Sequence, residues 1–358
     1  TAADEFSGLP AAEDLARGFP DLDLADSPAN LTPEDKIALA REAEAAALNT
    51  DSRVTNSEGA EFSSGSRELL YANSLGFIGR YDTTSYSLSV VPVASQNGTM
   101  QRDYWYSSHR KLNRLEPAPV VGKKAAERTL RRLGARRVKT QQAPVVFDPE
   151  TAASLLRHLA GAVSGSALYR KTSFLLGKLS EKIAASGIWI DDDAHILSAL
   201  GSKPFDGEGL PTCRTAVVAD GVLTSYLLDT YSARKLGLRS TGNASRSFAD
   251  VPTASPTNFF LRPGTTSPEE IIRSVRSGLY VTELSGFGVN PVTGDYSRGA
   301  VGLWIENGEL AYPVEEITIA GNLLEMFQHI EVTGHDLELR GSIAAPTLKI
   351  ARMTIAGE

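Results

Sequence analysis

The stretch Gly286-Phe287-Gly288-Val289-Asn290-Pro291-Val292-Thr293-Gly294-Asp295-Tyr296-Ser297-Arg298-Gly299-Ala300 is the most informative part of the sequence for the fold. Its glycines permit positive φ angles and close backbone approach. The run from Asp295 to Arg298 places consecutive hydrogen-bonding side chains at the start of a strand. Leu303-Trp304-Ile305 then leads into an Asn-Gly turn and a second strand. We therefore predict a polar loop held on a rigid β-hairpin.

The rest of the C-terminal half alternates short strands with turns and a few helices. We predict strands at 145–147, 215–219, 222–228, 330–339 and 347–355, with helices at 149–163, before Gly237, at 268–275 and at 323–328. Asp148-Pro149-Glu150 and Ser267-Pro268-Glu269-Glu270 supply the helix starts. This pattern predicts a β-rich C-terminal domain, residues 143–358, with a curled or barrel-like antiparallel sheet and peripheral helices.

The N-terminal half combines helices with a β-meander. Thr32-Pro33-Glu34-Asp35 precedes a helix at 38–48, and β-type patterning runs from 53 to 106 with a turn at Gln96-Asn97-Gly98. A second helix is predicted at 120–133. Residues 1–30 are predicted to be a surface connection, and residues 31–142 an α/β domain. The whole chain is thus predicted to be α+β.

Composition sets limits on the function. The chain has 358 residues, 42% of them hydrophobic, and a formal net charge of −7, which indicates a globular protein without a general attraction to nucleic acid. The lone Cys213 excludes an intrachain disulfide. No apolar run approaches the ~18 residues of a membrane span. We expect a cytoplasmic protein without a membrane or nucleic-acid partner.

Two charged runs require interpretation. The helix at 120–133 and its exit carry eight basic residues, Lys123, Lys124, Arg128, Arg131, Arg132, Arg136, Arg137 and Lys139. They could form a phosphate-binding stripe, but no aromatic residue is interleaved, so we interpret them as a solvated helix face. The run Asp191-Asp192-Asp193 is likewise interpreted as a solvated exit from a strand.

A family resemblance rests on ordered matches from Asp51 to the C-terminus. These are Asn56-Ser57-Glu58-Gly59, Met100-Gln101-Arg102-Asp103, Arg131-Arg132-Leu133-Gly134-Ala135, Tyr169-Arg170-Lys171-Thr172-Ser173-Phe174, Phe205-Asp206-Gly207-Glu208-Gly209, Tyr231-Ser232-Ala233-Arg234-Lys235-Leu236 and Ser240-Thr241-Gly242-Asn243. The chain resembles the TldD/PmbA family, called modulators of DNA gyrase and related to metallopeptidases, and specifically its PmbA/TldE branch. The resemblance implies that residues 1–30 are the tail of a longer N-terminal segment.

The resemblance also implies where a metal motif would lie. In the peptidase-like branch a helix carries His-Glu-x-x-x-His, whose imidazoles bind a metal while the Glu acts as general base. Aligned through Lys171-Thr172-Ser173, these three positions hold Leu156, Arg157 and Gly161. The loop 340–346 also lacks the cysteine of that branch. The neighbouring His158 is interpreted as a structural residue. We therefore expect no catalytic residue, metal or cofactor in this chain.

The resemblance then implies a non-catalytic subunit that pairs with a zinc-bearing TldD-type subunit to cleave small flexible peptides bound in extended form. Alternatives are a regulatory protein that modulates DNA gyrase without proteolysis and an independent metallopeptidase with unorthodox ligands. A partner or peptide cleft is predicted from the polar loops, whose residues are Tyr231, Arg234, Thr241, Gly242, Asn243, Asp295, Tyr296, Ser297 and Arg298. The same loops could instead only close turns through local hydrogen bonds. The isolated chain could also form a homodimer.

Overall fold

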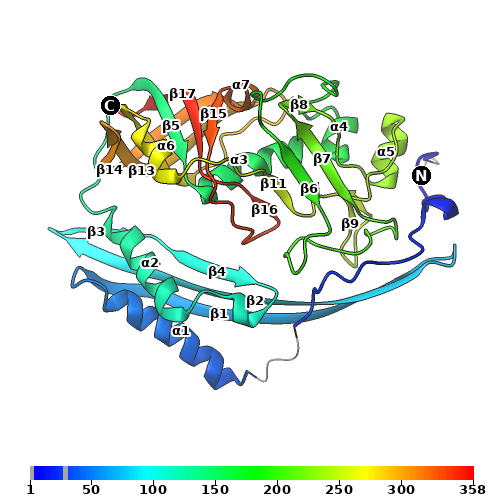
Figure 1. Cartoon of the computed structure of the whole chain (residues 1–358), viewed down its shortest axis with the longest axis horizontal. Coiled ribbons are helices and arrows are strands. Elements are labelled where there is room, and N and C mark those ends of the chain that lie inside the picture. The colour runs from blue at the N-terminus through cyan, green and yellow to red at the C-terminus, as the bar shows by residue number, and fades with distance from the viewer. Residues whose placement is uncertain (1–3, 27–30) are drawn as a thin grey trace.

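The computed structural model describes residues 4–26 and 31–358. A helix-covered sheet, the N-terminal unit, lies beneath a larger C-terminal unit that begins with the strand β5 and contains two sheets side by side (Figure 1). Within the described residues, every helix is too short or too polar to traverse a lipid bilayer. The α+β prediction, with a meander followed by a β-rich body, is confirmed.

The N-terminal unit consists of an antiparallel sheet with two helices packed on one face. Its elements are α1 (Pro33–Leu48), β1 (Val54–Ala72), β2 (Ile78–Gln96), β3 (Thr99–Arg102), β4 (Trp105–His109), the 3₁₀ turn η2 (Leu112–Arg114) and α2 (Ala118–Leu130). Thr32 and Asp35 form a capping box at the start of α1. Gly122 lets the two helices approach closely, because a Cβ there would lie 2.1 Å from the carbonyl oxygen of Ala43. Leu88 and Val90 from β2 close this core.

The β1–β2 hairpin is longer than the predicted meander, and each strand has 19 residues. It curves beneath the whole C-terminal unit (Figure 1). At its far end Phe77 packs edge-on against Phe205, with ring centroids 5.3 Å apart. Beside its other end, the side chain of Gln101 on β3 donates a hydrogen bond to Glu315. The N-terminal sheet therefore contacts the C-terminal unit through the far end of the hairpin and through β3 at the other end.

The first sheet of the C-terminal unit closes on itself. Its elements are β5 (Gln141–Phe147), β12 (Ser277–Ser285), β13 (Asp295–Glu306), β14 (Glu309–Asn322), β15 (Ile330–Thr333) and β17 (Leu348–Ala356), flanked by α6 (Pro268–Arg273) and α7 (Leu323–Gln328). The strand order is β14-β13-β12-β5-β17-β15, and pairing of β14 with β17 closes a five-stranded barrel. The prediction of a barrel-like sheet is confirmed, with β5 and β12 as its parallel pair.

The second sheet of this unit is open. Its elements are β6 (Ile190–Asp193), β7 (Arg214–Ala219), β8 (Val222–Leu223), β11 (Phe259–Leu261) and β16 (Ile343–Ala344), with α4 (Gly165–Tyr169), α5 (Thr230–Leu236) and the pair β9 (Ala244–Ser245) and β10 (Thr253–Ala254) beside it. The strand order is β16-β11-β6-β7-β8. The helix α3 (Pro149–Ala162) contacts strands of both sheets, and its apolar side chains join their common core.

Three predictions about local structure are wrong. The strand predicted at 330–339 ends at Thr333, because the chain turns at Gly334 and Asp336 then bonds back to Thr347. The strand predicted to reach residue 228 ends at Leu223.

The third error concerns the acidic run at 191–193, which is not solvated. Asp191 and Asp192 are fully buried. Asp191 binds Arg214 and Arg262, while Asp192 accepts hydrogen bonds from Asn243 and from the amide of Thr257. These carboxylates tie neighbouring segments of the second sheet together.

The N-terminal segment runs over the surface of the C-terminal unit. Residues 4–26 contain one short 3₁₀ turn, η1 (Ala12–Asp14). Leu22 and Leu24 are buried, and the amide of Ala16 bonds to the carbonyl of Gly209. The remaining positions of the predicted connection, 1–3 and 27–30, lie outside the described residues.

Candidate functional site

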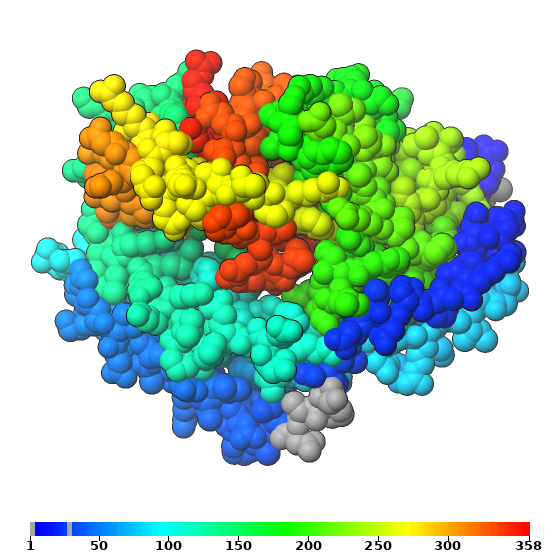
Figure 2. All heavy atoms as spheres, viewed as in Figure 1, coloured from blue at the N-terminus to red at the C-terminus, as the bar shows by residue number. Residues whose placement is uncertain are grey.

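A cavity of about 560 Å³ lies where the two units meet. Its walls come from β4 and α2 of the N-terminal unit, the first half of α3, and the loop 336–345, which follows β15 and includes the two-residue strand β16. That loop hangs from the C-terminal unit toward α2 (Figure 1) and fills the middle of the face shown in Figure 2. We take this cavity as the candidate functional site because its volume is in the range of ligand pockets and polar groups from three elements converge there.

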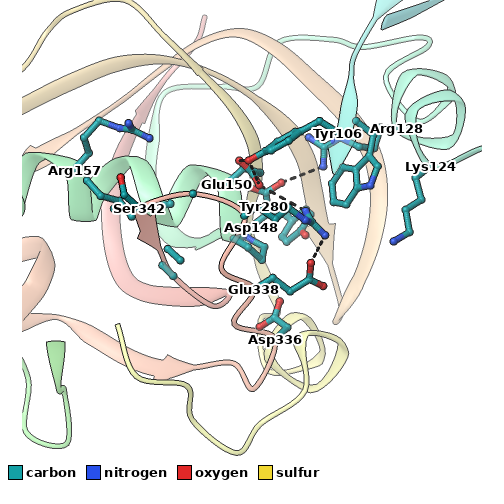
Figure 3. Close-up of a pocket in the computed structure, with 18 of the residues that line it drawn as sticks. Tyr106, Lys124, Arg128, Asp148, Glu150, Arg157, Tyr280, Asp336, Glu338 and Ser342 are labelled. Atoms are coloured by element: carbon teal, nitrogen blue, oxygen red, sulfur yellow. Dashed lines mark hydrogen bonds and ion pairs between the residues drawn. The ribbon is translucent and has the colours of Figure 1, made fainter. Parts of the chain in front are cut away.

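Charged side chains of both signs line the cavity in equal numbers. The basic ones are Lys124, Arg128, Arg131, Arg157 and Arg340, and the acidic ones are Glu127, Asp148, Glu150, Asp336 and Glu338. Trp105, Tyr106 and Tyr280 supply aromatic surface. Figure 3 shows Lys124 and Arg157 at opposite sides of the cavity, with Asp336 and Glu338 at a third.

The helix α3 begins at the cavity because its sequence carries a strong start signal. Asp148 is the N-cap, and its carboxylate accepts a hydrogen bond from the amide of Thr151, while Pro149 occupies the first turn. Leu155 and Leu159 face the core. The polar face of the helix is thereby turned toward the cavity.

The three positions that align with the metal motif lie on this helix and point in different directions. Leu156 is 1% exposed and packs in the core. Arg157 is exposed and lines the cavity (Figure 3). Gly161 is exposed, and open space surrounds the place where its Cβ would be.

These residues do not fit a catalytic metal. An aliphatic side chain and a glycine offer no ligand atom, and a guanidinium repels a cation and cannot accept a proton. Within the described part of the chain, no group of three or more His, Cys, Asp or Glu side chains is arranged to hold a metal ion. We derive no metal-dependent step in this chain.

His158 is the imidazole closest to these positions in the sequence. Its ring packs edge-on against Tyr296, with centroids 6.2 Å apart, and its Nε2 has no hydrogen-bond partner among the described residues. Burial and the positive charges of Arg298 and Arg157 lower the pKa of His158. The structural role of His158 stays a prediction.

Glu150 and Tyr106 form a hydrogen-bonded pair of titratable side chains across the boundary between the units. The phenol of Tyr106, on β4, lies 3.1 Å from both carboxylate oxygens of Glu150, on α3 (Figure 3). Burial raises the pKa of Glu150, and the Tyr106 hydrogen bond partly opposes this shift. Burial and the nearby Glu150 also raise the pKa of Tyr106. The phenol therefore stays protonated and donates to the carboxylate.

Arg340 fixes the loop 336–345 to the N-terminal unit. Its guanidinium lies 4.1 Å from the ring centroid of Trp105 and forms ion pairs with Glu116, Glu150 and Glu338. The side chain is only 13% exposed. The loop is therefore fixed by contacts on both sides of the cavity.

The basic run is only partly solvated, which corrects part of our prediction: Lys123, Arg136, Arg137 and Lys139 are exposed, but the arginines at the end of α2 are not. Arg128 and Arg132 are largely buried, at 12% and 11% side-chain exposure. Arg128 lies 3.4 Å from both Asp103 and Asp148, and Arg132 binds Glu283. Arg131 lies beside them and lines the cavity. The sequence did contain a signal that these side chains share one face of α2. Lys124, Arg128 and Arg131 are separated by four and three residues, and such spacing places side chains on the same side of a helix.

Two of the predicted cleft residues bind the N-terminal segment. The hydroxyl of Tyr231 donates to Asp4, and Arg234 donates to the carbonyls of Phe6, Gly8 and Leu9. Both side chains lie on α5. They hold residues 4–9 against the C-terminal unit.

The neighbouring loop 241–243 is bound internally. Thr241 bonds to the carbonyl of Leu228 and to the amide oxygen of Asn243, and Asn243 is buried against Asp192. Gly242 adopts a φ of +68°, and a Cβ there would meet the carbonyl oxygen of Pro211. Both the positive φ angle and the close approach of Pro211 therefore favour glycine at position 242.

The last predicted group, 295–298, lies at the start of β13. Asp295 bonds to Thr293 and Asn322, Tyr296 is buried, and the amide of Ser297 bonds to the carbonyl of Gly288. Arg298 donates to the carbonyl of Ser285 and lies 3.5 Å from the hydroxyl of Ser154 on α3. No hydrogen bond or ion pair described in the structure joins this group to α5 or the loop 241–243, and none of the nine predicted residues lines the cavity.

Comparisons with known proteins cover nearly the whole chain. Residues 26–133 match the PmbA/TldA metallopeptidase central domain, and residues 140–357 match the PmbA/TldA metallopeptidase C-terminal domain. The chain is 44% identical to Metalloprotease PmbA of Escherichia coli O157:H7, across all of this chain and 77% of that protein. It is 27% identical to the Metalloprotease TldD homolog of Haemophilus influenzae, across 92% of this chain and 73% of that protein.

Solved structures give the same result for the fold. A putative modulator of DNA gyrase from Bacteroides thetaiotaomicron superimposes with a TM-score of 0.92 and 34% identity, covering all of this chain and 80% of the other. TldE from Thermococcus kodakarensis superimposes with a TM-score of 0.86 and 24% identity, covering 100% and 81%.

Proposed function

This chain belongs to the PmbA/TldD family of metallopeptidase-related proteins, and from that premise we propose that it is the non-catalytic, PmbA/TldE-type subunit of a two-component peptidase. A homologous TldD-type subunit supplies the zinc and the general base. This chain supplies part of the surface on which a small flexible peptide is positioned.

One observation carries the proposal, namely the chemistry of the three motif positions on α3. Leu156 is part of the packed core, Arg157 places a positive charge at the cavity, and Gly161 has no side chain. Restoring the His-Glu-x-x-x-His motif would require three substitutions, one of which would bury an imidazole in the core. The loop 336–345 contributes carboxylates and a clamping arginine but no thiolate.

The cavity nevertheless suits a peptide. The strand β16 is the terminal strand of the open sheet and pairs with β11 on one side only. Its residues Ile343 and Ala344 line the cavity. An extended peptide that pairs with the free edge of β16 would gain main-chain hydrogen bonds without dependence on sequence, which fits a flexible substrate.

A gyrase-modulating role without proteolysis has less support. The name of the Bacteroides structure mentions DNA gyrase, but the basic run on α2 is the only feature of this sequence that favours nucleic acid. Three arginines of that run are directed into the protein, and two of them bind carboxylates. They are not displayed as a phosphate-binding stripe.

Co-expression with a TldD-type protein tests the proposal. We expect a stable complex on size-exclusion chromatography and cleavage of a labelled unstructured peptide by the complex. This chain alone should not cleave the peptide, with or without added zinc. A complex whose TldD-type subunit carries Gln for the Glu of its motif is the matched control and should assemble without activity.

Two results would refute the proposal. One is peptide hydrolysis by this chain alone at a rate comparable to that of the complex. The other is stoichiometric zinc retained by the isolated chain after brief chelation. A homodimer of the isolated chain is compatible with the proposal, because a surface built for a homologous partner can pair with itself.

A further inference from the structure

Arg131 is a cation that forms no direct ion pair with any described residue. It occupies the C-cap of α2, and its side chain makes no hydrogen bond or ion pair with any described residue. Its Nε and Nη2 are buried and unpartnered. The residue nevertheless lines the cavity. A buried guanidinium without partners is costly unless a ligand satisfies it.

Four of the five acidic side chains of the cavity are already bound elsewhere, and the fifth, Glu127, is exposed and lies 3.8 Å from Lys123. Asp148 caps α3 and pairs with Arg128, and Asp336 accepts two hydrogen bonds from Thr347. Glu150 accepts from Tyr106, and Glu338 pairs with Arg340. Arg131 therefore remains unsatisfied even though acidic and basic side chains are equally numerous around the cavity.

We propose that Arg131 binds a single carboxylate, the α-carboxylate at the C-terminus of an extended peptide. A guanidinium presents parallel N–H donors that match the two oxygens of a carboxylate. A monoanion fits the cavity better than a phosphate dianion, because the five acidic side chains would repel a second negative charge. Trp105, Tyr280 and Ile343 provide apolar surface for the last side chain of the peptide.

The volume of the cavity favours a chain end. About 560 Å³ accommodates a few residues. This inference rests on the proposed function, since it identifies which feature of the peptide the non-catalytic subunit recognises. It implies that this subunit selects free C-termini and thereby sets the distance from the peptide end to the site of cleavage in the partner.

Peptide binding by the full chain tests the proposal separately from catalysis. The probe is fluorescein-labelled penta-alanine with a free C-terminus, compared by fluorescence anisotropy with the same peptide ending in an amide. We expect the free acid to bind about 10- to 100-fold more tightly, the range for a charge-assisted pair. The Arg131→Gln variant should lose this preference and bind both peptides with the affinity of the amide.

Controls separate the sources of the anion and general charge effects. Arg137→Gln removes one positive charge from an exposed arginine outside the cavity and should retain the preference. A C-terminally amidated peptide with one internal glutamate should bind no better than the plain amide, and inorganic phosphate at millimolar concentration should not displace the free acid.

Several results would overturn the inference. These are equal binding of acid and amide by the unmodified chain, no detectable binding of the free acid, a preference that survives in Arg131→Gln, tight binding of the internal glutamate, and displacement by phosphate. None of them concerns assembly with a TldD-type subunit or hydrolysis, so this inference and the proposed function can fail independently. Arg131→Met checks the fold: with its buried charge removed, its thermal midpoint should equal or exceed that of the unmodified chain.

Discussion

At the scale of single residues, replacing two glycines near the end of α3 by alanine should change the stability of the protein in opposite directions. Gly161 lies in the last turn of the helix, where open space surrounds the position of a Cβ. Gly161→Ala should stabilise the protein by about 0.5 kcal/mol, because alanine has the higher helix propensity and nothing obstructs its methyl group. Urea-induced unfolding followed by circular dichroism measures the change.

Gly165, four residues later, is the matched control. A Cβ there would lie 2.1 Å from Oγ of Ser232, a fully buried side chain that bonds to Asp229. Gly165→Ala should therefore destabilise the protein by about 1–3 kcal/mol through overpacking. Destabilisation by both substitutions would show that the space around Gly161 is not open in solution.

The same scale shows what the sequence could predict about the site. The mismatch at Leu156, Arg157 and Gly161 is visible in the sequence because the family motif has a fixed spacing. The unpartnered state of Arg131 is not visible, because it depends on where carboxylates from distant segments lie. The nine polar residues predicted for a cleft were chosen for hydrogen-bonding capacity, and the structure shows that much of this capacity is used internally.

At the scale of structural elements, the loop 336–345 depends on one side chain. Arg340 is nearly buried between Trp105 and the carboxylates of Glu116, Glu150 and Glu338. Arg340→Met should release the loop from the N-terminal unit at a cost of about 1–3 kcal/mol, typical of a broken buried network. Hydrogen exchange measured by mass spectrometry should show faster exchange in the segment 334–347.

Arg80 provides the matched control for an exposed arginine. It pairs with Glu68 and Asp82 on the hairpin, but its side chain is 59% exposed. Arg80→Met should change stability by no more than about 0.5 kcal/mol and leave exchange of the loop unaffected. Unchanged exchange in Arg340→Met would mean that the backbone alone holds the loop.

The helices and turns could be predicted where the sequence signals that specify them lie within a few residues of each other. The starts of α1, α3 and α6 follow from N-cap residues and prolines, and the hairpin turns follow from Asn97-Gly98 and Asn307-Gly308, whose φ angles are all positive. The length of the β1–β2 hairpin was not predictable, since its support comes from contacts such as Phe77 with Phe205, far apart in the sequence. The end of β15 at Thr333 likewise depends on bonds between Asp336 and Thr347.

At the scale of the whole molecule, the candidate site exists only because two units are joined. The cavity takes α2 and β4 from one unit and α3 with the loop 336–345 from the other. Arg128 links them: it lies beside Asp103 of the N-terminal unit and Asp148 of the C-terminal unit, and it donates to the carbonyl of Thr282. Its side chain is only 12% exposed.

This link leads to a prediction about the whole fold. Arg128→Met should destabilise the protein by about 3–5 kcal/mol, because it leaves two buried carboxylates without a counter-charge. The loss should decouple the units, so that unfolding in urea, followed by tryptophan fluorescence and by circular dichroism, no longer gives coincident transitions. In the unmodified chain the two signals should coincide.

Neutralising the carboxylates tests the cause. If the cost arises from uncompensated charge, adding Asp103→Asn and Asp148→Asn to Arg128→Met should recover at least half of the lost stability, since asparagine still serves as an N-cap for α3. If the cost arises instead from lost packing, the triple variant should be no more stable than Arg128→Met. Replacing the two carboxylates by amides removes charge but restores none of the contacts that the arginine side chain made. The first outcome would establish charge pairing across the cavity wall as the interaction that holds the two halves of the site in place.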